Sequence, residues 1–146
     1  IKVGAATEVE MIEKKHRIDD ALEAVRSAQE EGIVPGGGIS LLKSVSDVEI
    51  QTDNEEQALG AKIVVEAVEE PIRQMSKNSG MSPDLVIQQV RETTTFNHGM
   101  NFLTGDIVNL LESGVIDPVK VTKCALQNAV SVASTIITTS HAIVNP

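Results

Sequence analysis

Residues 32–39 read Gly-Ile-Val-Pro-Gly-Gly-Gly-Ile, and this stretch divides two segments with helical patterns. Before it, the Thr-Glu-Val-Glu pattern at residues 7–10 fits a capping box, which predicts a helix over residues 7–31 that ends at Gly32. After it, an apolar run predicts a short helix over residues 39–45. The stretch therefore joins two helices through a proline and three consecutive glycines.

Gly36, Gly37 and Gly38 form the first candidate for a ligand site. Residues without side chains let a backbone approach a ligand closely, and exposed N–H groups at a helix start attract anions. A flexible turn is the commoner explanation of such a tripeptide. Neither the Walker A pattern, with its Lys-Ser or Lys-Thr pair, nor the GxGxxG pattern is completed here. The glycines alone therefore leave both explanations open.

The predicted helix over residues 7–31 carries an apolar stripe and, away from it, a pair of aspartates. The stripe has three-, four- and seven-residue spacing and is predicted to be buried. Its members are Met11, Ile18, Leu22, Val25 and Ala28. At about 100° per residue, Asp20 lies roughly 200° from Ile18 and points away from the stripe. Asp19 and Asp20 are thus candidates for a general base, although a solvated helix face is the commoner explanation of such a pair.

The rest of the chain predicts further helices and little β structure. A strand is predicted at residues 1–3, a polar connection at 46–52, a helix over 53–75 interrupted at Pro71, and a helix over 82–91. Residues 93–103 predict a β-hairpin that turns at 97–99. A short helix over 104–114, a long helix over 119–138 capped by Asp117, and an edge strand at 143–144 follow. The predicted fold class is mainly α, with a small β-hairpin and short edge strands.

Composition limits the classes of function. The 146 residues carry a net charge of −9, include two Phe but no Trp or Tyr, and are 41% hydrophobic, which suits a folded domain. Acidity and the shortage of aromatic rings argue against binding to nucleic acid. Cys124 is the only cysteine, which excludes an intrachain disulfide and a zinc cluster and favours a reducing compartment. The three histidines lack metal-ligand spacing, and no apolar run reaches the roughly 18 residues that span a bilayer.

Five longer stretches occur in an order that is characteristic of one family. They are residues 3–11 (VGAATEVEM), 14–22 (KKHRIDDAL), 31–38 (EGIVPGGG), 114–122 (GVIDPVKVT) and 125–129 (ALQNA). In these stretches, which span nearly the whole chain, the sequence strongly resembles the group I chaperonins of the GroEL type. The resemblance implies the C-terminal part of such a subunit. Residues 1–30 would belong to its intermediate domain and residues 31–146 to the C-terminal half of its equatorial, ATP-binding domain, a helical bundle.

The resemblance also implies roles for individual residues. Asp20 corresponds to the aspartate that orients the water attacking the γ-phosphate of ATP, and Asp117 to the aspartate that accepts hydrogen bonds from the ribose. The family often has small residues where Phe102 and Leu103 stand, so contacts at these two positions are expected from the backbone. The remaining nucleotide-binding residues implied are Gly36, Gly37 and Gly38 next to the nucleotide, Asn101, Phe102 and Leu103 beside the adenine, and Val115 nearby.

An ATP-dependent chaperonin is the function that the resemblance implies. Such a subunit uses ATP and Mg²⁺, with the magnesium ligands expected mainly in an N-terminal half that this chain lacks. The implied partners are identical subunits in heptameric rings, a co-chaperonin of the GroES type and unfolded polypeptides. The implied location is the bacterial cytoplasm, with a mitochondrial matrix or plastid as alternatives; nucleic acid and membrane are not expected.

The chain itself starts at Ile1, inside a predicted strand, and we expect it to be a piece of a longer protein. Such a piece is expected to lack ATPase activity and to self-associate, because a divided equatorial core exposes apolar surface. The alternative interpretation is an acidic helical interaction or oligomerisation module without nucleotide chemistry.

Overall fold

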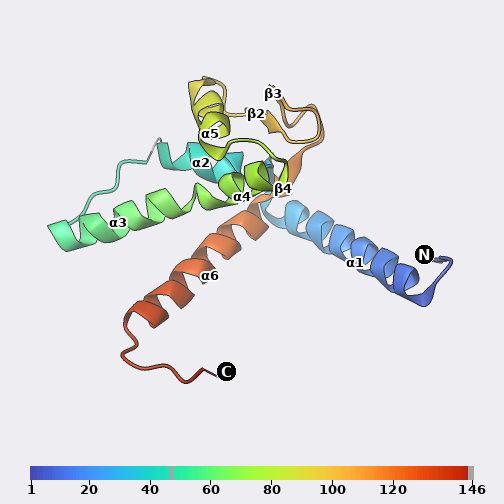
Figure 1. Ribbon diagram of the computed structural model, residues 1–146, viewed down its shortest axis with the longest axis horizontal. Coiled ribbons are helices and arrows are strands. Elements are labelled where there is room, and N and C mark those ends of the chain that lie inside the picture. The colour runs from blue at the N-terminus through green and yellow to red at the C-terminus, as the bar shows by residue number, and fades with distance from the viewer. Residues whose placement is uncertain (47, 145–146) are drawn as a thin grey trace.

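The computed structural model describes residues 1–46 and 48–144, which form six helices and four short strands (Figure 1). The predicted fold class, mainly α with a minor β part, is confirmed. None of the helices within the described residues has the length and apolar character that crossing a bilayer requires. In chain order the elements are α1 (Glu8–Glu31), β1 (Ile33–Pro35), α2 (Ile39–Ser46), α3 (Glu55–Ala67), α4 (Glu70–Asn78), α5 (Pro83–Glu92), β2 (His98–Asn101), β3 (Asp106–Asn109), β4 (Ile116–Pro118) and α6 (Val119–Ile137).

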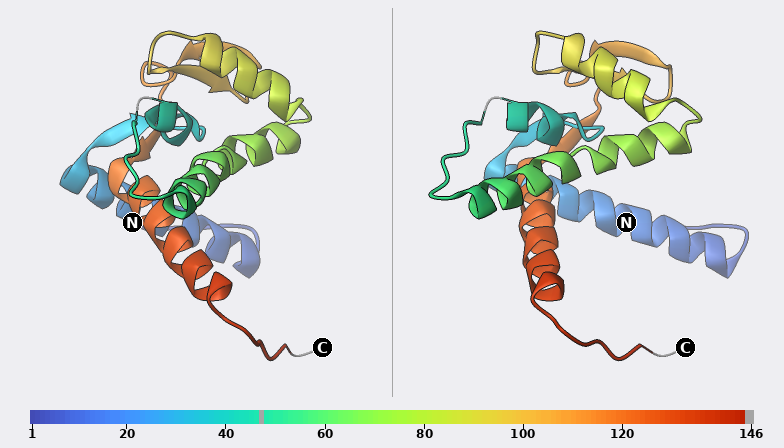
Figure 2. Two further views of the ribbon diagram at one scale, coloured as in Figure 1. Left: turned by 90° about the vertical axis from the view of Figure 1, so that its left-hand side faces the viewer. Right: turned by 60° about the vertical axis from the view of Figure 1, so that its left-hand side comes forward.

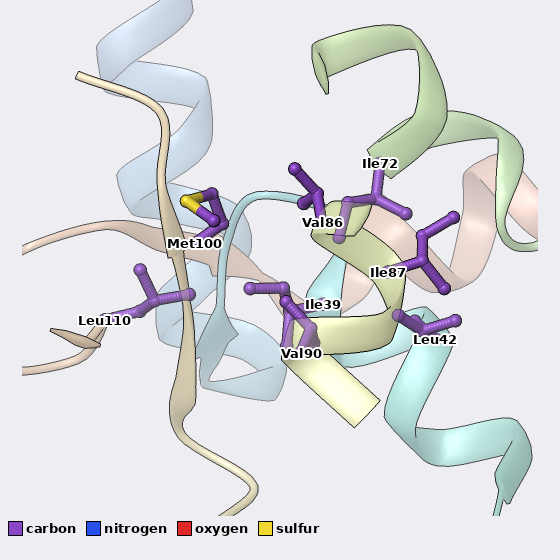
Figure 3. Close-up of a cluster of buried hydrophobic side chains, with 8 residues drawn as sticks. All are labelled: Ile39, Leu42, Ile72, Val86, Ile87, Val90, Met100 and Leu110. Atoms are coloured by element: carbon purple, nitrogen blue, oxygen red, sulfur yellow. The ribbon is translucent and has the colours of Figure 1, made fainter. Parts of the chain in front are cut away.

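The buried core is small and is built from the short elements. Helices α2, α4 and α5 pack together with the β2–β3 hairpin, and their apolar side chains meet in one cluster (Figure 3). Removal of this apolar surface from water is the main source of stability in the region. The cluster consists of Ile39, Leu42, Ile72, Val86, Ile87, Val90, Met100 and Leu110.

The three longest helices extend away from this core. In Figure 1, α1 runs to the right, α3 to the left and α6 downward, and Figure 2 shows the same three projections from other sides. No residue of α1, α3 or α6 is buried. The predicted burial of the α1 stripe is therefore wrong within this chain, since Met11, Leu22 and Val25 are 41%, 45% and 57% exposed. The spacing of the stripe is helical, but the described residues cover it only in part: Ile18 and Ala28 are half-buried, and residues 1–3 lie across a hollow from its N-terminal half.

Both ends of α1 agree with the prediction. The Thr7 hydroxyl accepts a hydrogen bond from the Glu10 N–H at 3.3 Å, and the Glu10 carboxylate accepts one from the Ala6 N–H at 3.2 Å. Gly32 ends the helix with φ of 85° and donates its N–H to the Ala28 carbonyl at 2.8 Å. A capping box and a terminal glycine thus fix the helix through contacts within one turn.

The helical segments after α2 begin and end near the predicted positions. Pro71 lies in the first turn of α4, so the interruption separates two helices. The start of α3 is one residue later than predicted, because Asn54, and not Asp53, accepts the cap hydrogen bond from the Gln57 N–H at 2.9 Å. The predicted connection at 46–52 includes residue 47, which lies outside the described residues, as do residues 145–146 at the end of the predicted second domain.

The β-hairpin exists but is displaced along the chain. Strand β2 pairs antiparallel with β3, and His98 lies opposite Asn109. The predicted turn at 97–99 is wrong because Gly99 lies within β2, where the absence of a side chain leaves room for Ile39. The predicted helix over 104–114 is also wrong, since residues 102–105 turn the chain into β3. The Asn101 carbonyl accepts from the Gly105 N–H at 2.8 Å and stabilises that turn.

The strands predicted at 1–3 and 143–144 are absent from the described residues. Both segments consist of β-formers, but a strand requires a neighbour that supplies its hydrogen bonds. Ile1 is 95% exposed and Ile143 is fully exposed, so no such neighbour lies beside either segment.

Candidate functional site

Strands β1 and β4 bring two distant parts of the sequence together. They pair antiparallel, with Val34 opposite Asp117. Two further backbone hydrogen bonds flank the pair: the Gly36 N–H donates to the Val115 carbonyl at 3.0 Å, and the Val119 N–H donates to the Gly32 carbonyl at 3.1 Å. The glycine loop at residues 36–38, Val115 and Asp117 therefore lie next to one another.

Two glycines of this loop lie close to neighbouring backbone. A Cβ on Gly36 would lie 3.3 Å from the Val115 carbonyl group, which is closer than an ordinary contact. Gly38 has φ of 73°, and a Cβ there would lie 3.1 Å from the Ile72 nitrogen. A positive φ favours glycine because other residues are strained in this region. Packing therefore favours glycine at position 36, and packing and backbone conformation together favour it at position 38.

Gly37 connects the loop to the hairpin. Its φ is 69°, and a Cβ built on it would lie 3.8 Å from the Met100 carbonyl oxygen and 4.0 Å from Cε2 of Phe102. These are ordinary contact distances, so the loop and the β2 end lie side by side without crowding. Helix α2 begins directly after the loop, and its first turn carries the partial positive charge of a helix N-terminus.

Residues 101–103, which are predicted to lie beside the adenine, fall partly in β2 and partly in the turn that follows it. Phe102 is half-buried and packs against the core, whereas Leu103 is 93% exposed. The Asn101 side chain accepts a hydrogen bond from the Leu103 N–H at 3.0 Å, so in this structure it stabilises the turn. Phe102 is thus the side chain of this segment that lies beside Gly37, and Leu103 points into solvent.

Asp117 has a different structural role from the one predicted. Pro118 occupies the N-cap position of α6, and no side chain caps that helix, so the predicted cap by Asp117 is wrong. The reason is that Asp117 belongs to β4, where its backbone continues the pairing with β1. Its carboxyl group is partly buried, and desolvation raises its pKa above the ordinary value of 3.8. A carboxylate held in such surroundings interacts strongly with a hydroxyl donor, as the predicted ribose contact requires.

Asp20 is not brought to the other candidate residues. It is exposed on α1, twelve residues before Gly32, which corresponds to about 18 Å along the helix axis. The direction of α1 in Figure 1 carries it away from the glycine loop. The site therefore consists of one assembled part, formed by residues 36–38, 101–102, 115 and 117, and one separate carboxylate.

The assembled part does not by itself supply a metal site within the described residues. Among residues 1–46 and 48–144, no three His, Cys, Asp or Glu side chains come together as metal ligands, so these residues do not fit Mg²⁺ by themselves. Helix α2 starts directly after the glycine loop, and backbone N–H groups at a helix N-terminus attract anions. A surface hollow lies elsewhere, between residues 1–3 and the apolar face of α1.

Several residues that hold the site were not found from the sequence. Ile72 and Met75 of α4 lie under Gly38, and Val34 pairs with Asp117. Lys43 of α2 reaches the segment before β2. None of these carries a local signal, because each acts on a residue far away in the sequence.

Comparisons with known proteins agree with the fold. A family model described as the TCP-1/cpn60 chaperonin family matches residues 1–146. Among solved structures, the chain is similar to one titled "Crystal structure of group III chaperonin in the open state", with 27% sequence identity and a TM-score of 0.80. The match covers 97% of this chain and 30% of that chain. The described fold thus corresponds to less than a third of the length of that relative.

Proposed function

Because the chain belongs to the TCP-1/cpn60 chaperonin family, we propose that it is the C-terminal part of an ATP-dependent chaperonin subunit. In this proposal residues 1–30 belong to the intermediate domain and residues 31–146 to the equatorial domain. The observation that carries the proposal is the pairing of β1 with β4, which joins the glycine loop to Val115 and Asp117 beside Phe102. The motif stretches favour a group I subunit, and the group III relative at 27% identity supports the broader family.

The assembled part of the site would bind the nucleotide. ATP supplies the phosphoryl group that is transferred to water. Backbone N–H groups of Gly37 and Gly38, with the N-terminus of α2, would attract the phosphates. Asp117 would accept a hydrogen bond from a ribose hydroxyl, and the backbone at 101–103 would lie beside the base. Magnesium ligands would come from the N-terminal part of the subunit.

Asp20 would act only after α1 changes its direction. Its carboxylate would orient the attacking water by accepting one of its hydrogens. The helix ends at Gly32, directly before β1, so this junction is the natural pivot. Two ion pairs join α1 to α6 next to the pivot, Glu30 with Lys120 and Glu31 with Lys123, the second at 2.6 Å. A swing of α1 would couple hydrolysis to a change of shape.

The role of Asp20 can be tested in a full-length subunit that contains this segment. Asp20→Ala is expected to lower ATP turnover by about 100-fold or more while the dissociation constant for ATP stays unchanged, because the carboxylate acts on water and not on the bound nucleotide. Asp19→Ala is the matched control and is expected to leave turnover unchanged. A near-normal rate in Asp20→Ala would show that the assignment is wrong.

The wider activity belongs to the same proposal. ATP hydrolysis would drive capture, encapsulation and release of unfolded polypeptides by heptameric rings of identical subunits, with a co-chaperonin of the GroES type. The compartment would be reducing, and we propose the bacterial cytoplasm, with a mitochondrial matrix or a plastid as alternatives. The single cysteine supports a reducing compartment.

A second candidate function is an acidic interaction or oligomerisation module. The observation that favours it is the exposure of large apolar side chains on the projecting helices, including Ile63 at 54% and Ile136 at 67%. Exposed apolar surface promotes association. If this describes the 146-residue chain, light scattering after gel filtration should give a mass that rises with concentration. A monomer mass at all concentrations contradicts this candidate and leaves the chaperonin proposal unaffected.

A further inference from the structure

We infer that Lys43 is a positioning residue. It holds the two halves of the candidate nucleotide site, the glycine loop and residues 101–102 at the end of β2, at a fixed distance from each other. The inference rests on the proposed function, because it assigns a residue to that same site. Lys43 lies in α2, one turn after the helix begins at Ile39. Its hydrogen bonds go neither to the glycine loop nor to Asp117. They go to the segment that leads into β2, on the other side of the site.

The side chain of Lys43 closes three hydrogen bonds to the segment between α5 and β2. Its ammonium nitrogen lies 2.6 Å from the Thr93 hydroxyl, 2.6 Å from the Thr95 carbonyl oxygen and 2.9 Å from the His98 carbonyl oxygen. An ammonium group has three N–H donors, so all three are used. A hollow opens beside it, lined by Arg91 and Phe96 among others. Because no donor of Lys43 is free, the side chain holds the segment and does not serve a ligand there.

The hydrogen bonds of Lys43 all go to uncharged oxygen atoms. Within the described residues, no carboxylate forms a salt bridge with it. Partial burial also lowers its pKa, which is the effect of removing a charge from water. The charge is therefore retained against a desolvation cost, and the three oxygen acceptors are what offset it. Hydrogen bonds that involve a charged group are stronger than neutral ones.

Lys43 shares a helix face with the residue that locks α2 onto β2. Ile39 and Lys43 are four residues apart, so they lie on the same side of α2. A Cβ on Gly99 would lie 1.6 Å from Cδ1 of Ile39, which means that Ile39 fills the space left by the glycine. Ile39 thus fixes α2 against the middle of β2, and Lys43 fixes it against the segment that leads into β2.

This face of α2 sets the distance between the two halves of the site. The helix starts from the glycine loop, and the Leu42 N–H donates to the Gly38 carbonyl at 3.4 Å. Strand β2 ends at Asn101, directly before Phe102. A shift of residues 93–98 would therefore move Phe102 relative to Gly37; at present a Cβ built on Gly37 would lie 4.0 Å from Cε2 of Phe102.

The test compares Lys43→Met with Lys62→Met in a full-length subunit that contains this segment. Methionine keeps most of the apolar stem and removes the donors; Lys62 is an exposed lysine of α3 and serves as the matched control. For Lys43→Met, amide hydrogens of residues 94–103 are expected to exchange about tenfold faster. The KM for ATP should rise about tenfold while kcat changes by less than about twofold, because binding and not chemistry is affected. Lys62→Met should change neither quantity.

A second variant keeps the test decisive if Lys43→Met folds poorly. Thr93→Val removes one of the three acceptors and preserves the shape of the side chain, so it should shift exchange and KM in the same direction by a smaller factor. Unchanged exchange at 94–103 in both variants overturns the inference. Faster exchange with an unchanged KM also overturns it, since Lys43 would then stabilise the segment without positioning the site. A wild-type subunit that does not bind ATP contradicts the proposed function instead, and the exchange measurement still decides whether Lys43 holds the segment.

Discussion

Similar apolar side chains are buried in the short elements of this protein and exposed on its long helices. In the core, Ile39, Ile72 and Leu110 are fully buried by neighbours that come from four different elements. On α3, Leu59 and Ile63 have the same chemistry and are 62% and 54% exposed. An amphipathic pattern therefore predicts that a face can be buried, but the partner that buries it must be found elsewhere. The relative in the structural comparison is more than three times as long as the matched region.

The largest effect should come from truncating one leucine in each region. Leu110→Ala is expected to lower the free energy of unfolding by about 2–5 kcal/mol, because a fully buried side chain leaves a cavity. Leu59→Ala should change it by no more than about 0.5 kcal/mol, because the side chain is mostly in solvent. Urea denaturation of the 146-residue chain measures both. Equal losses would mean that α3 is buried in solution and that the contrast between the regions is wrong.

Replacing a glycine by alanine should change the stability in opposite directions in the two regions. Gly99→Ala places a methyl group 1.6 Å from Cδ1 of Ile39 and is expected to destabilise the core by about 1–3 kcal/mol. Gly60→Ala lies in the interior of α3 with open space around it and should stabilise by about 0.5–1 kcal/mol, because alanine favours helix. Thermal unfolding of the two variants checks the prediction. Stabilisation by Gly99→Ala would contradict the described packing of α2 on β2.

The smallest effect concerns Asp117, at the boundary between core and projecting helices. Burial raises the pKa of Asp117 in the folded protein, so the folded state binds this proton more tightly than the unfolded chain does. The resulting stability is fully present below the ordinary pKa of 3.8 and is lost as the pH rises through the raised folded value. Asp117→Asn removes the buried charge, so its melting temperature at pH 7 should be slightly higher than that of the wild type.

The difference between Asp117→Asn and the wild type should disappear as the pH falls below 3.8, because the aspartate is then protonated in both the folded and the unfolded chain. Asp106→Asn, an exposed aspartate of β3, is the matched control and should leave the melting temperature unchanged. A lower melting temperature for Asp117→Asn at pH 7 would show that the carboxylate has a stabilising partner.

Local signals predicted the helices well, and they did so for a physical reason. Thr7, Glu10 and Gly32 fix the ends of α1 through bonds within one turn, so the sequence contains the whole cause. Pro71 and Pro83 likewise mark helix starts because proline restricts its own backbone. Signals of this kind identify elements and their order, and hence the fold class.

Contacts between distant residues account for what could not be predicted. Gly99 was assigned to a turn because glycine is common there, but Ile39, sixty residues earlier, determines that it lies in a strand. Asp117 was assigned to a helix cap because it precedes a proline, yet pairing with Val34 determines its place. The resemblance to a family supplied the candidate site residues, and the structure brings residues 36–38, 101–102, 115 and 117 together while leaving Asp20 apart.

The pairing of β1 with β4 has a consequence for the order of folding. These strands enclose the whole of residues 36–115, so their contact closes a long loop and carries a large entropic cost. The core elements lie inside this loop and can form from contacts of shorter sequence separation. We expect the pairing of Val34 with Asp117 to form last. In pulse-labelled hydrogen exchange, the amide hydrogen of Val34 should therefore gain protection after that of Val90. A nucleotide that binds beside this strand pair would then recognise only chains that have finished folding.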